Sequence, residues 1–350
     1  MESQYHLIEQ RLEVLPWYIT EFIEYKGRKS SEHTLLDYCR DFEIFFHWLV
    51  AEAIIPGPVK DITLEALEQL RAKDITSFET HCTIQRGNAK DTVARRVAAL
   101  KSLFHYLSQI AEDDNMYPYL KRNVMAKIDV VREKHSEDEK AEQIAGRILV
   151  NDEINFFREF VASEYAKLVQ NSKRIYNAHI RNRERDVAII SLILGSGLRV
   201  SEVVSLDMDK IDWNKQHVLI KRKGSKHEKV VFSDVALQDL LDYRLIREER
   251  YHPDKSEKAF FLSSATRTGK ANRFSKSSAQ KMVEKYAEAF GKGDLTIHKL
   301  RHTFATQHYK TNKDIATLKR QLGHSNINTT MIYTHVFDNT LKDSVNKADK

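Results

Sequence analysis

Cysteine, proline and glycine are scarce in this sequence, whose 350 residues include only 2, 5 and 11 of them. So few turn-forming residues exclude collagen-like, linker-rich and multi-turn all-β chains, and they favour helices. Cys39 and Cys82 have no metal-binding spacing, so we expect reduced, buried thiols in a cytoplasmic protein rather than a single disulfide. Long apolar runs are also missing: the longest covers residues 187–194, whereas a membrane-spanning helix needs about 20 residues. The charged first residues predict no secretory signal.

The charge is nearly balanced over the whole chain but unevenly distributed along it. There are 56 Lys and Arg residues against 50 Asp and Glu, a net charge of +6. Residues 1–120 carry 13 basic and 19 acidic side chains, whereas residues 121–350 carry 43 and 31. A net charge of +12 on the second segment is typical of proteins that bind a polyanion, most often nucleic acid. Residues 86–101 are the basic part of the acidic segment. The candidate phosphate contacts there are Lys90, Arg95 and Arg96.

Length and hydrophobic patterning predict two domains joined by a charged linker. The expected segments are a helical domain at 1–115, a linker at 116–147, a second domain at 148–338 and a polar tail at 339–350. In the first domain we expect helices over about 31–53, 64–80 with a break near 73–74, and 89–110, and another either before Pro16 or over 17–25. Residues 132–142 are mostly charged, which predicts exposure to solvent.

The second domain is expected to be helical with one β-hairpin, formed by residues 218–223 and 229–232 around Gly224 and Ser225. The fold class is therefore mostly α: a helical domain followed by an α+β domain with a small hairpin or sheet. Before a buried helix at 186–194, residues 171–185 are strongly basic. That stretch is either a solvated loop or helix face, or a phosphate-contacting segment.

Four short segments carry groups suited to chemistry on a phosphate. Arg199 follows two glycines, and Glu202 lies three residues later, close enough on a helix to orient the guanidinium. His298 and Arg301 are also three residues apart and so share a helical face. The other two segments are the hairpin tip with Lys223 and Lys226, and Leu-Gly-His ending at His324 with Tyr333 nine residues later. Each segment alone has an ordinary structural explanation. Their order and spacing, taken together, favour a functional role.

In this order the sequence resembles the tyrosine recombinase (phage integrase) family. The family pattern is Arg in a G-x-R-x-S-E segment, Lys in a β-hairpin, H-x-x-R, L-G-H, and Tyr nine residues later. The matching residues are Arg199, Lys223, His298, Arg301, His324 and Tyr333. The segments PWY at 16–18, RNVM at 122–125 and RERDVAII at 183–190 are similar to the Xer subfamily, above all its XerS group. The resemblance covers nearly the whole chain and implies a core-binding domain followed by a catalytic domain.

The resemblance implies that DNA is cut and rejoined through a 3′-phosphotyrosyl intermediate, with no metal and no cofactor. Tyr333 would be the nucleophile, and Arg199 and Arg301 would bind the non-bridging phosphate oxygens. His324 would donate a further hydrogen bond, and His298 would be the base or an orienting group. The remaining roles fall to Lys223 as general acid, Lys226 as its substitute and Glu202 as support for Arg199.

The resemblance also implies the partners. These would be double-stranded DNA with a dif-like site, a homotetramer on two DNA sites, and a FtsK-type DNA translocase as activator; no membrane is expected. The tail at 339–350 is either a helix lent to a neighbouring protomer or a frayed end. Three alternatives stay open: an integrase of a phage or mobile element, a type IB-like topoisomerase, and a non-catalytic DNA-binding regulator. Little length remains for an arm-binding domain, and a pure binder would not need Tyr333.

Overall fold

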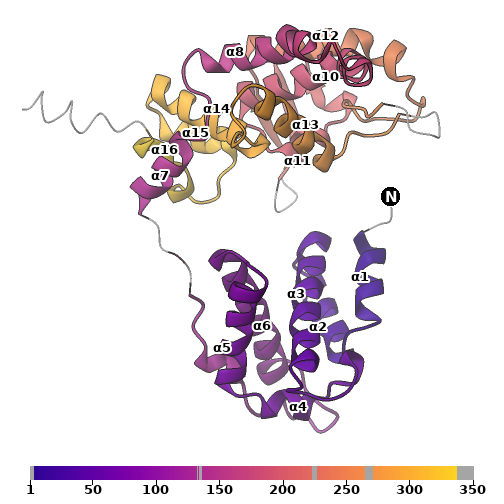
Figure 1. Cartoon of the computed structure of the whole chain (residues 1–350), viewed down its shortest axis with the longest axis vertical. Helices are drawn as coiled ribbons and strands as arrows, with labels where there is room; N and C mark the ends of the chain where they lie inside the picture. Colours follow the sequence, from indigo (N-terminus) through magenta and orange to yellow (C-terminus); the bar gives the residue numbers. More distant parts are fainter. Residues whose placement is uncertain (1–3, 132, 134–135, 223–226, 265–270, 337–350) are drawn as a thin grey trace, which may run out of the picture. The chain divides into compact units, whose positions relative to one another are not determined.

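The computed structural model describes every residue except 1–3, 132, 134–135, 223–226, 265–270 and 337–350. The chain forms two compact units, Met1–Lys134 and His135–Lys350 (Figure 1). Both are built mainly of helices, and the second also contains a small antiparallel sheet, which confirms the predicted fold class. Over the described ranges, none of the helices combines the length and apolar character that a membrane crossing requires.

The first unit is a helical domain with an aromatic core. Its helices are α1 (Gln4–Leu12), α2 (Trp17–Gly27), α3 (Glu32–Ala51), α4 (Leu64–Gln69), α5 (Ala72–Thr80) and α6 (Lys90–Gln109), with short 3₁₀ or π turns at Val59–Asp61, His81–Gln85 and Val124–Lys127. The long helix α3 packs against α1, α2 and α6 (Figure 1). Its Phe42, Phe45 and Phe46 are fully buried there, and large aromatic side chains of this kind each remove much apolar area from water.

Local capping explains where these helices begin. The Oγ of Ser31 accepts a hydrogen bond from the backbone N–H of Thr34 at 3.3 Å, so Ser31 is the N-cap of α3. Helices form on both sides of Pro16, so both of the alternatives for the first helix occur. The break in the 64–80 stretch lies at residues 70–71 rather than 73–74. The reason is that Asp74 accepts from the backbone N–H of Arg71 at 2.7 Å and so starts α5.

The expected linker at 116–147 is packed at both ends. Leu120 and Met125 are buried in the core of the first unit. Helix α7 (Glu137–Ala145) belongs to the second unit, where Ala141 and Ile144 are buried in a small cluster with residues of α14 and α16. These two side chains lie three residues apart and form a narrow apolar face. In the sequence these two residues are surrounded by charged residues, so the apolar face was not recognised there. The boundary between the two units falls at residues 134–135.

The second unit is built around the long helix α10, whose second half is buried. Its elements are α8 (Glu153–Glu159), a π turn (Phe160–Glu164), α9 (Tyr165–Val169), α10 (Lys173–Ser196), α11 (Val200–Val204), a 3₁₀ turn (Met208–Lys210), β1 (Ile211–Asp212), β2 (His217–Lys221), β3 (His227–Val231), α12 (Asp234–Tyr251), α13 (Lys276–Ala289), α14 (Ile297–Asn312), α15 (Ile315–Leu322) and α16 (Asn328–His335). Helix α10 packs against α12 and α14. Strands β2 and β3 form the predicted hairpin, and β1 adds a third antiparallel strand to it.

The basic stretch at 171–185 lies almost entirely within α10, so it is a helix rather than a loop. Lys173, Arg174 and Arg181 are exposed on that helix. Arg185 is buried, however, where it binds Asp186 and donates to the backbone carbonyl of Leu262 at 2.9 Å. A guanidinium committed to a buried ion pair is not available to a DNA phosphate, so Arg185 does not fit the phosphate-contacting alternative.

Candidate active site

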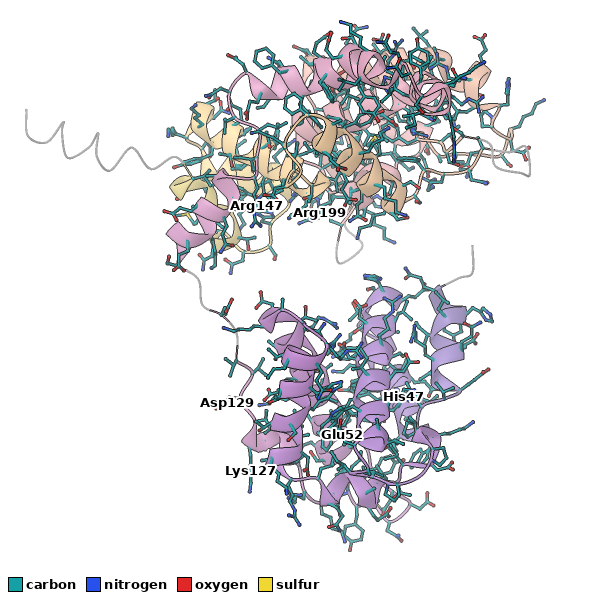
Figure 2. The ribbon with its side chains drawn as sticks, viewed as in Figure 1. His47, Glu52, Lys127, Asp129, Arg147 and Arg199 are labelled. Atoms are coloured by element: carbon teal, nitrogen blue, oxygen red, sulfur yellow. The ribbon has the colours of Figure 1, made fainter. Side chains whose placement is uncertain are left out.

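A pocket of about 540 Å³ in the second unit brings together five of the predicted site residues. The predicted residues that line it are Arg199, His298, Arg301, His324 and Tyr333, and its other lining residues are Lys140, His302, Asn328, Thr329 and Ile332. They come from α7, α14, α16 and the turns that precede α11 and α16. Helices α7, α14, α15 and α16 gather at one end of this unit (Figure 1), and Arg199 lies beside this group (Figure 2).

Arg199 enters the pocket directly from the turn that ends α10. Gly197 ends that helix at φ +69°, and a Cβ there would overlap the ring of Phe304. This close approach is open only to glycine. Arg199 is then the N-cap of α11: its backbone N–H donates to one oxygen of Glu202 at 2.8 Å, and its Nη1 donates to the other at 2.9 Å. Glu202 therefore holds both the backbone and the guanidinium of Arg199, as the three-residue spacing predicted.

Arg301 is buried at the centre of the pocket wall and links three segments. Its guanidinium donates to the backbone carbonyl of Gly197, to that of Leu322 at 2.8 Å, and to Nε2 of His324 at 3.1 Å. Burial and the nearby charge of Arg199 lower the pKa of Arg301 to about 10, so this side chain still carries its charge at neutral pH. The turn after α10 and the end of α15 are thereby held on either side of one positive charge.

His324 is a neutral acceptor in this arrangement. Burial, reinforced by the charges of Arg301 and Arg199, lowers its pKa to about 4. Its Nδ1 lies 2.9 Å from the hydroxyl of Thr330, and its Nε2 faces Arg301, which can only donate. The proton of the neutral ring therefore belongs on Nδ1. To donate from Nε2 to a phosphate, as predicted from the family resemblance, His324 must gain a proton or exchange its contact with Arg301.

Tyr333 is buried on α16 with only 3% of its surface exposed. Burial raises the pKa of its phenol to about 12, although Arg301 and Arg199 oppose this shift. Its Oη lies 2.8 Å from Nδ1 of His302, a residue that was not among the predicted site residues. The available signal was its position four residues after His298, which places both rings on one face of α14. His298 packs its own ring edge-to-face against that of His302, with 4.6 Å between the centroids.

The hairpin that carries the predicted general acid is anchored beside the pocket. Lys223 and Lys226 themselves lie outside the described residues. Arg222 directly follows β2, and its side chain is almost completely buried: it binds Glu202 at 3.2 Å and Glu228 at 2.6 Å. It also donates to the backbone carbonyl of Gln321 at 3.0 Å. Sequence reasoning missed Arg222, which connects the hairpin to the carboxylate of Glu202 and to the end of α15.

Substituting Gly323 tests this anchoring. Gly323 ends α15 at φ +64°, and a Cβ there would overlap the guanidinium of Arg222. We expect Gly323→Ala to lower the free energy of unfolding by about 2–4 kcal/mol, since backbone strain and overpacking add. Gly291→Ala is the matched control: its φ is +83°, but nothing lies within 4 Å of the added Cβ, so only about 1–2 kcal/mol should be lost. Urea unfolding measures both, and equal losses would contradict the predicted role of the Arg222 contact.

The buried histidines make the stability of the second unit depend on pH. Burial lowers the pKa of His302 to about 3 and that of His179 and His324 to about 4, below the usual value of about 6.5. As the pH falls below about 6.5, the unfolded chain binds protons that the folded chain does not. Each histidine then removes up to about 1.4 kcal/mol from the free energy of unfolding per pH unit. Urea unfolding between about pH 7.5 and 5 should show this loss, and His179→Gln should reduce the slope; an unchanged slope would contradict the assignment.

Not all predicted phosphate contacts of the first unit are exposed. Arg96 is buried: it donates to the side chain of Asn88, and its Nε lies 3.4 Å from Asp41. This contradicts its prediction as a DNA contact, because the buried carboxylate of Asp41 needs neighbouring positive charge. Arg95 also binds Asp41 but keeps about half of its side chain exposed. Lys90 is exposed and pairs with Glu133 at 2.6 Å.

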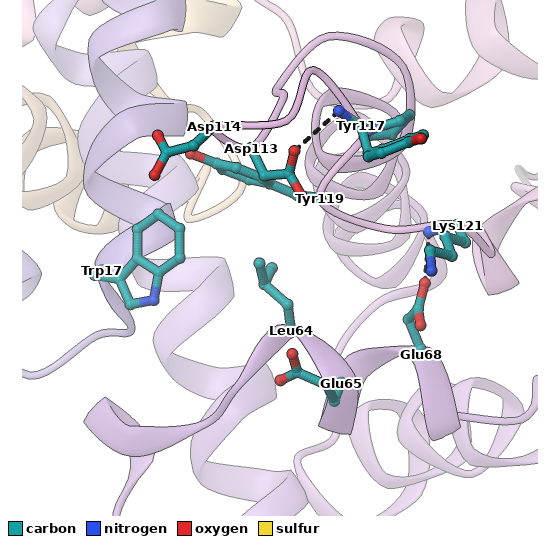
Figure 3. Close-up of a pocket in the computed structure, with 10 residues that line it drawn as sticks. Trp17, Leu64, Glu65, Glu68, Asp113, Asp114, Tyr117, Tyr119 and Lys121 are labelled. Atoms are coloured by element: carbon teal, nitrogen blue, oxygen red, sulfur yellow. Dashed lines mark hydrogen bonds between the residues drawn. The ribbon is translucent and has the colours of Figure 1, made fainter.

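A larger pocket, of about 790 Å³, lies in the first unit and differs in charge from the candidate active site (Figure 3). Its acidic lining residues are Glu65, Glu68, Asp113 and Asp114. Asp113 accepts from the backbone N–H of Tyr117 at 2.9 Å, and Glu68 accepts from that of Lys121 at 2.5 Å (Figure 3). Asp113 and Glu68 thus hold the backbone of residues 117–121, and the negative charge of this pocket repels phosphate. In the part of the chain that the structure describes, no three His, Cys, Asp or Glu side chains are arranged to hold a metal ion.

Two family models and the full-length relatives place this chain in the same family. The model "Phage integrase family" matches residues 160–340, and "Phage integrase, N-terminal SAM-like domain" matches residues 19–109. The tyrosine recombinase XerS of Streptococcus uberis is 36% identical over 352 residues, and that of Streptococcus mutans is 36% identical over 351 residues. Each alignment covers 97% of this chain and 97% of the relative.

Solved structures show the same fold at lower identity. The XerH site-specific recombinase bound to difH substrate, in a pre-cleavage complex, aligns with a TM-score of 0.64 at 20% identity and covers 95% of both chains. A lambda integrase dimer bound to a COC′ core site aligns with a TM-score of 0.59 at 14% identity, over 92% of this chain and 77% of that one.

Proposed function

Because the chain belongs to the phage integrase family of tyrosine recombinases, we propose that it is an Xer-type enzyme. It cuts and rejoins DNA at a dif-like site through a 3′-phosphotyrosyl intermediate. The observation that carries this proposal is one pocket in which Arg199, Arg301, His324 and Tyr333 meet from three separate segments. End-to-end similarity to XerS relatives favours this function over that of a mobile-element integrase.

Cleavage begins with the attack of Tyr333 Oη on the scissile phosphorus. The Oη–P bond forms, the P–O5′ bond breaks, the phenol loses its proton and the departing 5′ oxygen gains one. With a pKa near 12, only about one phenol in 10⁵ is ionised at neutral pH, so proton loss accompanies attack. Lys223 supplies the proton to the 5′ oxygen as general acid. His298, which contacts the pocket from α14, is the candidate base or orienting group.

Charge stabilisation comes from the two arginines. The transition state gathers negative charge on the non-bridging oxygens, and guanidinium groups bind such oxygens through paired N–H donors. Arg199 is held in place by Glu202, and Arg301 by two backbone carbonyls, so both are positioned before substrate binds. Preorganised charge of this kind is usually the largest catalytic contribution. The phosphotyrosyl bond retains the energy of the phosphodiester, so a free 5′ hydroxyl can reverse the step without ATP.

The partners extend this proposal. Double-stranded DNA is the substrate, and the net charge of +12 on residues 121–350 supports its binding. Two protomers occupy each dif-like site, and a homotetramer joins two sites, with a FtsK-type translocase as activator. The tail at 339–350, expected to be either a helix lent to a neighbouring protomer or a frayed end, lies outside the described residues. Lys90 and Arg95 are the remaining candidate phosphate contacts of the first unit, and the reaction takes place in the cytoplasm, where chromosomal DNA lies.

A plasmid assay separates this function from the alternatives. A supercoiled plasmid carrying two directly repeated dif-like sites is incubated with the protein beside the same plasmid without sites. A site-specific recombinase resolves only the two-site plasmid into two circles. Relaxation of both plasmids would instead indicate a topoisomerase. Binding without any change in either plasmid would indicate a non-catalytic regulator and would overturn the proposal.

A further inference from the structure

We propose that His302 is the positioning residue of the nucleophile: it accepts the hydrogen bond of Tyr333 Oη and aims that oxygen at the bound phosphate. This inference rests on the proposed function, in which Tyr333 attacks the phosphorus. The contact is direct, with 2.8 Å between Oη and Nδ1, and it joins α14 to α16. The rings lie 5.6 Å apart between centroids. The pattern H-x-x-R ends one residue before His302, so the motif itself assigns this residue no role.

The charges around the phenol determine the direction of this hydrogen bond. Arg301 and Arg199 both act on Tyr333 as nearby positive charges. The lone pairs of Oη are stabilised when they face those guanidinium groups, and its single proton is stabilised when it points away from them. The proton therefore lies toward Nδ1 of His302. A lone pair of the nucleophile is thereby left facing the side of the pocket on which the arginines would hold a phosphate.

His302 can act as an acceptor because its ring stays neutral. Burial lowers the pKa of His302, and the neighbouring His298, Lys299 and Arg301 lower it further. A protonated ring would have no acceptor nitrogen and would turn a donor toward the phenol. The neutral ring has one acceptor, and the edge-to-face contact with His298 restrains its plane. His298 thus helps to hold the ring that contacts Tyr333.

Two substitutions of His302 separate acceptor geometry from bulk. His302→Leu keeps a side chain of similar size but removes the acceptor. His302→Asn retains a short side chain with a carbonyl oxygen at about the distance of Nδ1 from the backbone. His308→Leu is the control: it is the same substitution on the same helix, and His308 lies outside the pocket.

The experiment is single-turnover cleavage of a nicked suicide substrate at saturating protein, with DNA affinity and thermal unfolding measured in parallel. We expect His302→Leu to slow formation of the covalent adduct by about 10²-fold, because small misplacement of a reacting group has effects of this size. DNA affinity should change by less than about twofold. His302→Asn should recover most of the rate, and His308→Leu should cleave like the unaltered protein.

Cleavage by His302→Leu at the unaltered rate would overturn the proposal. If His302→Leu does not fold, the cleavage rates of His302→Asn and His302→Gln test the proposal instead, because the two side chains place their acceptor oxygen at different distances from the backbone. Faster cleavage by the Asn variant supports positioning at Nδ1, and equal rates overturn it. Failure of the underlying function would look different: the unaltered protein would form no adduct, or Tyr333→Phe would still form one.

Discussion

Tyr333→Phe is expected to abolish the covalent adduct between protein and DNA while leaving DNA binding intact. The substitution removes only Oη, and the ring keeps its place in the apolar cluster with Leu318 and Leu322. Loss of the hydrogen bond to His302 should lower the free energy of unfolding by only about 1 kcal/mol. Without the oxygen there is no nucleophile, so cleavage should fall by about 10⁴-fold or more.

The adduct is measured on a nicked dif-type suicide substrate as an SDS-stable band, and binding is measured by gel shift on the intact site. Tyr309→Phe serves as the matched control, because Tyr309 lies on α14 outside the pocket. This control should form the adduct at the unaltered rate. A Tyr333→Phe protein that still becomes covalently linked to DNA would refute the assignment of Tyr333 as the nucleophile and the interpretation of this pocket as the active site.

Arg199→Ala should have the second-largest effect: cleavage reduced by about 10²–10³-fold, with specific DNA binding nearly unchanged. Losing one preorganised donor to the transition state typically has an effect of this size. Binding should persist because residues 121–350 carry 43 basic side chains, most of which remain to attract phosphates. Folding should persist too, because the buried carboxylate of Glu202 remains 3.2 Å from Arg222 and is not left unpaired.

Cleavage rate and DNA affinity should be measured together for Arg199→Ala. Arg174→Ala removes the same charge from an exposed position on α10 and controls for the overall electrostatic attraction. It should lower affinity slightly at low salt and leave the cleavage rate at saturation unchanged. If Arg199→Ala loses affinity and cleavage in equal proportion, the guanidinium contributes to binding rather than to the transition state.

Short-range pairings in the site could be predicted from the sequence. Arg199 and Glu202 are three residues apart, and so are His298 and Arg301, and a helix places such residues on one face. The structure contains both pairs. His298 and Arg301 lie on α14, whereas Arg199 is the N-cap residue of α11, and Glu202 reaches it in the capping arrangement rather than along a helical face. The hairpin was predictable for a similar reason, since β-branched residues flank a glycine-containing turn.

Contacts between distant segments could not be predicted in the same way. Arg96 and Arg185 look in the sequence like the other basic residues around them, yet each is buried against a carboxylate. Asp41 lies 55 residues before Arg96, and no local pattern connects the two. The bond between His302 and Tyr333, and the anchoring of Arg222 beside Gly323, likewise depend on helices that meet only in the folded chain.

The sequence by itself determined the kind of chemistry, because residue types and their order along the chain specify which groups are present and which share a helical face. It also determined the distribution of charge, which is net acidic over the first 120 residues and net basic over the rest. Only the tertiary structure decided which basic side chains are exposed and which histidine contacts Tyr333. Burial and hydrogen bonding depend on the packing of α14 against α10 and against α16, and this packing brings together residues that are far apart in the sequence.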